Sequence, residues 1–176
     1  MKNDTQEEKE LRVLGKSIPE ARYVKRTVTL RDMELPQDVL LTKQSLLRWV
    51  ALSLGVLSES ESRSTVVPVL DALLYFQVRE QRDPTVEEIK EYLDKESWGM
   101  RGKEAEQAIP EKAIRYHLGK LRAAGIVEMR KHRYSFARDP NNPAIPQSVR
   151  YVLESTFKPG MEKIEGAFSR LVTMYE

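Results

Sequence analysis

Cysteine is absent from this chain of 176 residues, and histidine occurs only twice. The missing thiols exclude disulfides and thiolate metal or redox sites, and two histidines exclude a His-rich metal site. The most apolar window, residues 46–57, is too short for a membrane-spanning helix and contains Arg48. The charged amino terminus lacks the apolar stretch of a secretory signal. We therefore expect a cytoplasmic protein with no bound cofactor and no contact with a membrane.

Catalytic motifs are missing as well. The sequence has no phosphate-binding glycine loop, no cluster of metal ligands and no nucleophile beside a base. Three carboxylates, Glu87, Glu88 and Glu91, lie near each other, but they fall in the first turns of an expected helix. Acidic residues at that position stabilise the helix dipole and face solvent. We do not expect an enzyme.

What the chain has in abundance is charge, and the charge is unevenly placed. Residues 111–138 hold eight Lys or Arg and two carboxylates, a net charge of +6, whereas the whole chain carries only +2. A local positive excess of this size is typical of a surface that binds a polyanion. The alternative is a solvated surface whose cations pair with carboxylates elsewhere in the fold. The richness in Glu, Lys and Arg also resembles the composition of archaeal or thermophile proteins.

Four segments are expected along the chain. Residues 1–22 form a charged amino-terminal arm with a short helix near residues 7–14. Residues 23–60 hold a strand or extended segment followed by a helix that Thr42 caps and Gly55 ends. That helix is apolar nearly all round, which predicts burial on most sides, either within the protein or at a subunit interface. A central domain spans residues 64–138, and carboxy-terminal helices span residues 144–176.

The central domain begins with two expected helices. Ser64 is a suitable cap for the first, and Pro68 falls in its first turns, where a missing N–H costs little. The second follows the turn at Asp83, where Thr85 and Glu88 have the spacing of a capping box.

A basic helix is expected over residues 110–124, between Pro110 and Gly125. Successive residues of a helix are about 100° apart, which puts three apolar residues on one side: Ile114, Leu118 and Leu121. We expect this side to be buried. The opposite side holds cations, an aromatic residue and a glycine, namely Lys112, Tyr116, Gly119 and Lys120, with Arg115 beside them. Such a surface suits the major groove of DNA.

A hairpin is expected next, over residues 126–138. Apolar and β-branched residues flank the polar tetrapeptide "RKHR" at residues 130–133. The tip of the hairpin is therefore basic.

The stretches "TVEEIKEYL", "KAIRYHLGKLRAAGIV" and "EMRKHRYSF" together resemble the winged helix-turn-helix family of bacterial and archaeal transcription regulators. The resemblance covers about residues 65–137. It implies a mainly α fold with a small β-hairpin wing, flanked by amino- and carboxy-terminal helices. It also implies double-stranded DNA as partner, with Lys112, Arg115, Tyr116 and Lys120 directed toward base edges or phosphates. On the wing it directs Arg130, Lys131, His132 and Arg133 toward the DNA backbone or minor groove.

The connection between the second expected helix and the basic helix departs from the family pattern, and His117 is considered separately. Residues 94–109 form a longer connection than the usual turn between the two helices. We expect a loop with Trp98 against the core, a loop that orders on DNA, an extra helical turn over residues 103–108, or a partner site. His117 lies at the edge of the buried side, which favours a structural histidine over a DNA contact.

The carboxy-terminal segment indicates assembly. An interruption is expected at Pro159 and Gly160. Beyond it, five apolar residues follow at steps of three and four, as in a coiled coil: Met161, Ile164, Phe168, Leu171 and Tyr175. They predict a homodimer, or else a helix that folds back on its own domain.

Two functions follow from these patterns. The first is a homodimeric transcription regulator, associated with the nucleoid, that binds specific DNA sequences. The second is a winged-helix module that binds proteins in a transcription or replication assembly, since this fold serves both purposes. No effector site is visible in the sequence.

Overall fold

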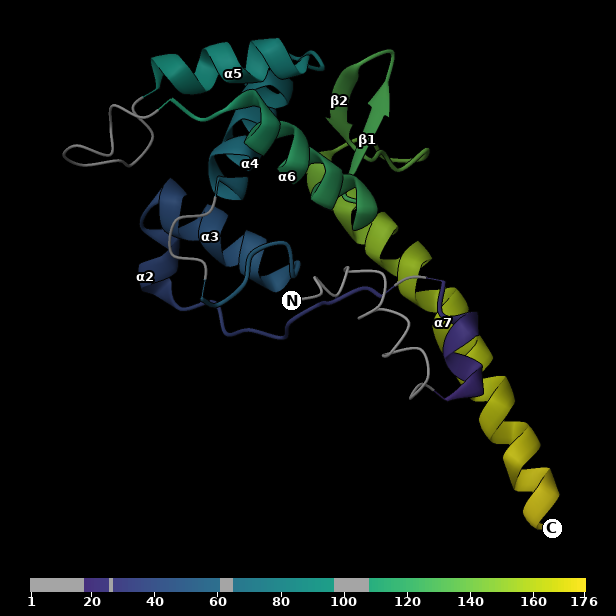
Figure 1. Ribbon diagram of the computed structural model, residues 1–176. Helices are drawn as coiled ribbons and strands as arrows, with labels where there is room; N and C mark the ends of the chain where they lie inside the picture. The colour runs from purple at the N-terminus through teal and green to yellow at the C-terminus, as the bar shows by residue number, and fades with distance from the viewer. Residues whose placement is uncertain (1–17, 26, 61–64, 97–107) are drawn as a thin grey trace, which may run out of the picture.

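The computed structural model describes residues 18–25, 27–60, 65–96 and 108–176. Within these ranges the protein is mainly helical, with a two-stranded antiparallel hairpin followed by a long carboxy-terminal helix (Figure 1). Its α-helices are α2 (Gln37–Leu40), α3 (Lys43–Ser53), α4 (Val66–Leu74), α5 (Val86–Lys95), α6 (Glu111–Ala123) and α7 (Ile145–Tyr175). The remaining elements are the 3₁₀ turn η1 (Pro19–Tyr23), the π-helical turn η2 (Tyr75–Arg79) and the strands β1 (Val127–Arg130) and β2 (Arg133–Phe136). The expected helix near residues 7–14, the Ser64 cap and Trp98 lie outside the described residues.

Helix α4 is the centre of the core. Eight consecutive residues, 66–73, are buried, because α3, α5, α6 and β2 all contact this one helix. One of them is charged: Asp71 accepts hydrogen bonds from Lys43 of α3 at 3.1 Å and from the Tyr92 hydroxyl of α5 at 3.4 Å. Burial, together with the charge of Asp71, raises the pKa of Tyr92. Asp71 thus joins three helices at one buried carboxylate.

Helix α3 has the predicted ends but is less buried than expected. Thr42 Oγ1 accepts from the Ser45 N–H at 3.1 Å, and Gly55 follows the helix with φ +67°. Only three of its residues are buried, Leu47, Ala51 and Ser53. Within one copy of the protein α3 packs chiefly against α4 and the short α2, so burial on most sides is not found there. A subunit interface over α3 stays a prediction.

The segment before α2 is extended and forms no strand in its described part. A Cβ at Gly55 would come within 2.8 Å of Thr29, so the extended segment passes directly over the end of α3. Arg31 fixes this crossing by donating to the Leu57 carbonyl at 3.0 Å. Of the two expected conformations for the start of residues 23–60, the extended one is observed over residues 27–36.

The hairpin is anchored to the turn before α5. Thr85 and Glu88 form the predicted capping box, which fixes the start of that helix. Arg133 of β2 donates to the Asp83 carbonyl at 2.7 Å and to Glu88 at 3.3 Å. Arg138 donates to the Asp83 carboxylate at 2.8 Å. The turn at residues 83–85 thus orients both α5 and the hairpin.

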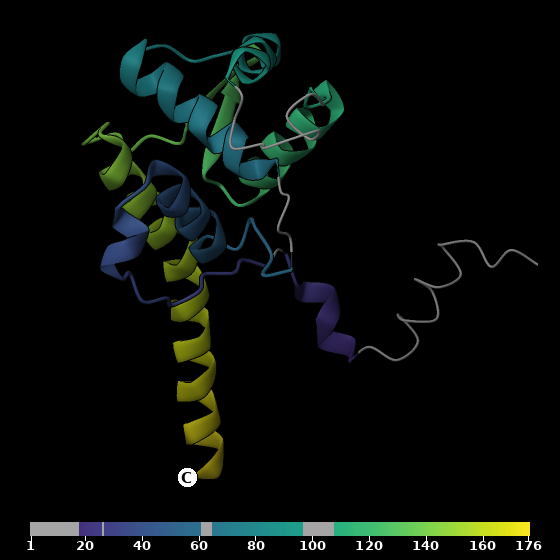
Figure 2. The same cartoon turned by 90° about the vertical axis from the view of Figure 1, so that its left-hand side faces the viewer.

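Helix α7 is continuous, so the expected interruption at Pro159 and Gly160 is wrong. Proline removes one N–H from the ladder, and the residues on both sides still form helical turns. Ser148 and Val152, in its first half, are buried against the body. The second half extends away from the body in both views (Figures 1 and 2). None of the helices in the described part of the chain is long and apolar enough to cross a membrane.

Replacing Glu88 by Gln should test the anchoring turn. Gln keeps an oxygen for the Thr85 N–H but loses the charge that holds Arg82 and Arg133. We expect the free energy of unfolding at neutral pH to fall by about 1 kcal/mol, typical of a partly exposed network of charged hydrogen bonds. Burial acts to raise the pKa of Glu88, but hydrogen bonds from Thr85 and Arg82 lower it below its ordinary 4.5.

The stabilisation of the fold by the Glu88 carboxylate is therefore present above about pH 4.5. It is lost as the pH falls through the pKa of Glu88 in the folded protein. Urea denaturation at neutral and at acidic pH should show that the difference in the free energy of unfolding between wild type and variant becomes smaller in acid. The control is Glu91→Gln, which removes an exposed carboxylate from the same helix and should change stability little. Equal losses for the two variants would contradict the anchoring role of Glu88.

Candidate nucleic-acid interface

Helix α6 has the ends and the buried side that its sequence predicts. Pro110 precedes its first turn, and Gly125 follows it with φ +76°. Ile114, Leu118 and Leu121 are each 0% exposed. Contacts with α4, α5 and β1 cover this side, so the orientation of the helix about its own axis is fixed.

The opposite side of α6 faces solvent. Lys112 and Gly119 are exposed, and Tyr116 keeps 61% of its surface accessible. The Lys120 Nζ lies 5.6 Å from the centre of the Tyr116 ring, a distance that permits a cation–π contact. A Cβ built at Gly119 would meet nothing within 4 Å. No packing within the described part of the protein therefore calls for a glycine at this position.

Arg115 lies between two carboxylates. Its guanidinium donates to Glu111 at 2.7 Å, one turn earlier in α6, and to Glu87 of α5 at 3.2 Å. The bond to Glu111 raises the pKa of Arg115. Backbone and Thr85 hydrogen bonds, helped by the charge of Arg115, lower the pKa of Glu87. The arginine is thus held in one place across the junction of the two helices.

His117 is buried beside this surface rather than part of it. Its exposed fraction is 8%, and its ring meets that of Tyr116 edge to face at 5.1 Å. This placement agrees with the expected structural histidine. Through the ring contact it also limits where Tyr116 can lie.

The hairpin tip presents two more side chains. Lys131 and His132 join β1 to β2, both exposed and both in the left-handed region, with φ +50° and +63°. A two-residue turn of this kind favours Asn-Gly, so Lys-His costs stability here. The neighbouring Arg130 pairs with Glu128 at 3.1 Å.

Half of the eight cations in residues 111–138 are neutralised within the fold. Four of them form ion pairs: Arg115, Arg130, Arg133 and Arg138. The other four make no ion pair within the part of the chain that the structure describes: Lys112, Lys120, Arg122 and Lys131. The alternative of cations paired within the fold therefore holds for these four arginines. A polyanion partner for the other four cations stays a prediction.

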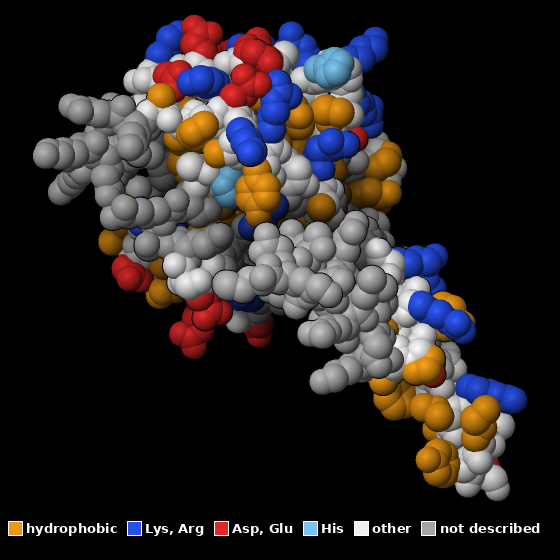
Figure 3. Space-filling view, in the orientation of Figure 1, with side chains coloured by type: hydrophobic (Ala, Val, Ile, Leu, Met, Phe, Trp, Pro, Cys, Tyr) orange, Lys and Arg blue, Asp and Glu red, His pale blue; other side chains and the backbone are white. Residues whose placement is uncertain are grey.

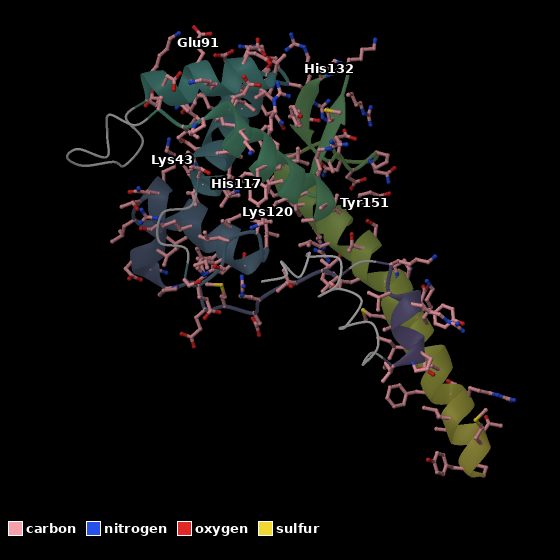
Figure 4. All side chains as sticks on the ribbon, in the orientation of Figure 1. Lys43, Glu91, His117, Lys120, His132 and Tyr151 are labelled. Atoms are coloured by element: carbon pink, nitrogen blue, oxygen red, sulfur yellow. The ribbon has the colours of Figure 1, made fainter. Side chains whose placement is uncertain are left out.

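These cations cover one face of the molecule together with carboxylates. In Figure 3, blue side chains lie over α6 and the hairpin, and red ones gather over α5. Figure 4 places His132 at the hairpin tip, Lys120 on α6 and Glu91 on α5. Among the described residues no group of three or more His, Asp or Glu could hold a metal ion. The connection at residues 97–107 lies outside the described residues.

Comparison of the chain with protein-family models, curated proteins and solved structures gave no match. The residues of α6 and the hairpin are therefore the basis on which the site is assigned.

Sequence patterns alone did not reveal the acidic partners of the arginines. The pair Glu111 and Arg115 has the i, i+4 spacing of a helical ion pair, which is a usable signal. The contact of Glu87 with Arg115 joins residues 28 positions apart, and that of Asp83 with Arg138 joins residues 55 apart. These contacts depend on the packing of α5 and the hairpin, and no local pattern encodes them.

Replacing Gly119 by Ala should stabilise the protein. The new methyl group enters open space, and alanine favours a helix interior over glycine by about 1 kcal/mol. Thermal or urea denaturation should show that the free energy of unfolding rises by an amount approaching that value. A loss of stability would mean that something unaccounted for occupies the space beside Gly119.

Proposed function

We propose that this protein is a transcription regulator that binds specific double-stranded DNA sequences through a winged helix-turn-helix domain. In this proposal α6 enters the major groove, and the hairpin is the wing that lies on the backbone or minor groove. The observation that carries the proposal is the two-sided character of α6. One side is fully buried, and the other presents Lys112, Tyr116 and an unobstructed Gly119.

The dimensions of α6 support this role. Its 13 residues make a helix about 20 Å long, and one whole side is open to solvent. The major groove of B-DNA admits an α-helix and presents a distinct pattern of donors and acceptors for each base pair. A glycine on the entering side allows the helix backbone to approach the bases closely.

The hairpin tip supports the role of a wing. Two non-glycine residues occupy strained backbone positions there, although Asn-Gly would form the same turn at lower cost. Strain that the fold does not require is typical of functional positions. Lys131 and His132 supply a charge and a hydrogen-bond donor where the tip would meet phosphates.

The expected contact residues are not equivalent in this proposal. Lys112, Lys120 and Lys131 make no ion pair within the described ranges, so binding phosphate costs them no such contact. Arg115 is already oriented by Glu87 and Glu111, which suits it to a base edge rather than a mobile phosphate contact. Arg133 is the least available, because it holds the hairpin on Asp83 and Glu88. It acts chiefly by positioning the wing.

A protein-interaction module is the second candidate, and the carboxylates favour it. Glu111 in the first turn of α6 and Glu87 of the neighbouring α5 both lie beside Arg115, where they would repel phosphates. Fluorescence-anisotropy titrations with random and genomic duplexes at two salt concentrations separate the candidates. Salt-sensitive binding that is tighter for some genomic fragments supports the regulator. No binding at low salt would reject it and leave the protein module.

Neutralising the unpaired lysines should flatten the salt dependence of DNA binding. Lys112→Gln and Lys131→Gln each remove one proposed phosphate contact. Each should weaken binding to all duplexes and reduce the slope of log K against log salt by about 0.9. Lys163→Gln is the control, because Lys163 is exposed on the distant half of α7. If the slope of log K against log salt is the same in all three variants, α6 and the wing do not contact the phosphate backbone of DNA.

Gly119→Ala should weaken DNA binding although it stabilises the fold. A methyl group at Gly119 would hold the α6 backbone away from the groove, so we expect at least a tenfold loss of affinity, or about 1.4 kcal/mol. The control is Gly166→Ala in α7, where a Cβ also meets nothing within 4 Å. That variant should gain stability and keep its affinity. Unchanged affinity in Gly119→Ala would show that this side of α6 does not approach DNA closely.

A further inference from the structure

The second half of α7 carries an apolar stripe that the described residues leave uncovered. Every residue from Lys158 onward is exposed. The stripe consists of large side chains that are between 47% and 90% accessible: Met161, Ile164, Phe168, Leu171 and Tyr175. Val172 and Met174 widen it toward the end, at 57% and 65%. Figure 3 shows apolar side chains on the projecting part of the helix.

This half of the helix is also intrinsically weak. It contains Pro159, Gly160 and Gly166, three of the residues that disfavour a helix interior. A Cβ at either glycine would meet nothing within 4 Å, so packing within the described protein does not compensate for them. In proteins most helical stability comes from the packing of an amphipathic face rather than from helix propensity, and among the described residues nothing packs on the apolar face of this half. Residues 158–175 therefore need a partner in order to remain helical.

The spacing of the stripe specifies the form of the partner. Phe157 precedes Met161 by four positions and extends the series, so apolar residues recur at steps of four and three over six positions. That repeat forms a seam, which one other helix covers by knobs-into-holes packing. The same repeat in a second copy has the right length and spacing to do so.

We propose that residues 157–175 pair in parallel with the same residues of a second copy, and that the second half of α7 becomes helical only on pairing. The pairing does not depend on DNA binding.

Charge selects the parallel arrangement. In a parallel pair the seam residues meet their own counterparts, and Glu165 lies beside Gly160 of the second copy. An antiparallel pair that covers all six seam residues would set Phe157 against Tyr175 and bring Glu165 beside Glu165. Like charges across a helix pair disfavour that register. The outward side carries Glu162, Lys163 and Arg170, which stay in water.

The first half of α7 fixes where the pair begins. Ser148 is 1% exposed, and its hydroxyl accepts from the Asp139 N–H at 3.0 Å. Val152, one turn later, is 8% exposed and belongs to the core. These contacts hold α7 on the body, and a parallel pair therefore places both bodies at the same end of the seam.

Disulfide trapping tests the arrangement directly, because the natural chain has no cysteine. Tyr175→Cys places a thiol in the seam, and a parallel pair should give a cross-linked dimer under mild oxidation. Thr173→Cys is the matched control, two residues away on the outward side, and it should remain uncross-linked. Equal cross-linking of both variants would indicate random collision. Cross-linking only in a mixture of Met161→Cys and Leu171→Cys would establish the antiparallel pair. Either result overturns the proposal.

Sedimentation and far-UV circular dichroism test the coupling of pairing to folding. Wild-type protein should be a dimer that loses helical signal when diluted until it dissociates. Ile164→Asp should be a monomer with the same lower signal and with the body still folded. Ser169→Asp, on the outward side, should behave as wild type. A monomeric wild type, a higher oligomer, or a dimer that dissociates without losing helix would each contradict the proposal.

Discussion

Burial of one side of α6 is the constraint on which the rest of the structure depends. Ile114, Leu118 and Leu121 are inaccessible to solvent, and together they set how the helix is rotated against α4 and α5. The same burial determines which residues face outward, including Tyr116 and Gly119. The outward surface of α6 follows from a packing requirement, because a helix that buries one side leaves the opposite side exposed. The proposed DNA contact is therefore a consequence of how the core is filled.

The cations of residues 111–138 are of two kinds: some form ion pairs that hold the fold together, and others form none among the described residues. Arg133 and Arg138 hold the hairpin to the turn before α5, and Arg115 bridges α5 and α6. These arginines use their charge to fix the position of the hairpin relative to α5 and α6. Lys112 and Lys131 have no such role within the described residues. A net charge of +6 in the sequence thus overstates the charge that a polyanion would meet.

Local signals predicted the elements around the site, whereas contacts across the fold were not predictable. The capping box of Thr85 and Glu88, the position of Gly125 and the alternation around the hairpin tip all act within a few residues. The unbroken course of α7 through Pro159 was not predicted, because the sequence signal for a helix end is local and strong. Nor was the contact of Glu87 with Arg115, which requires α5 and α6 to be packed first.

The central claim is that the outward side of α6 and the hairpin tip form the surface that meets DNA. Amide hydrogen exchange with and without a bound duplex measures this directly, because it reports protection along the whole chain. The account predicts added protection within residues 111–123 and 128–133, with α3 and the second half of α7 unchanged. Protection confined to other segments, or no change when the duplex is saturating, would contradict it.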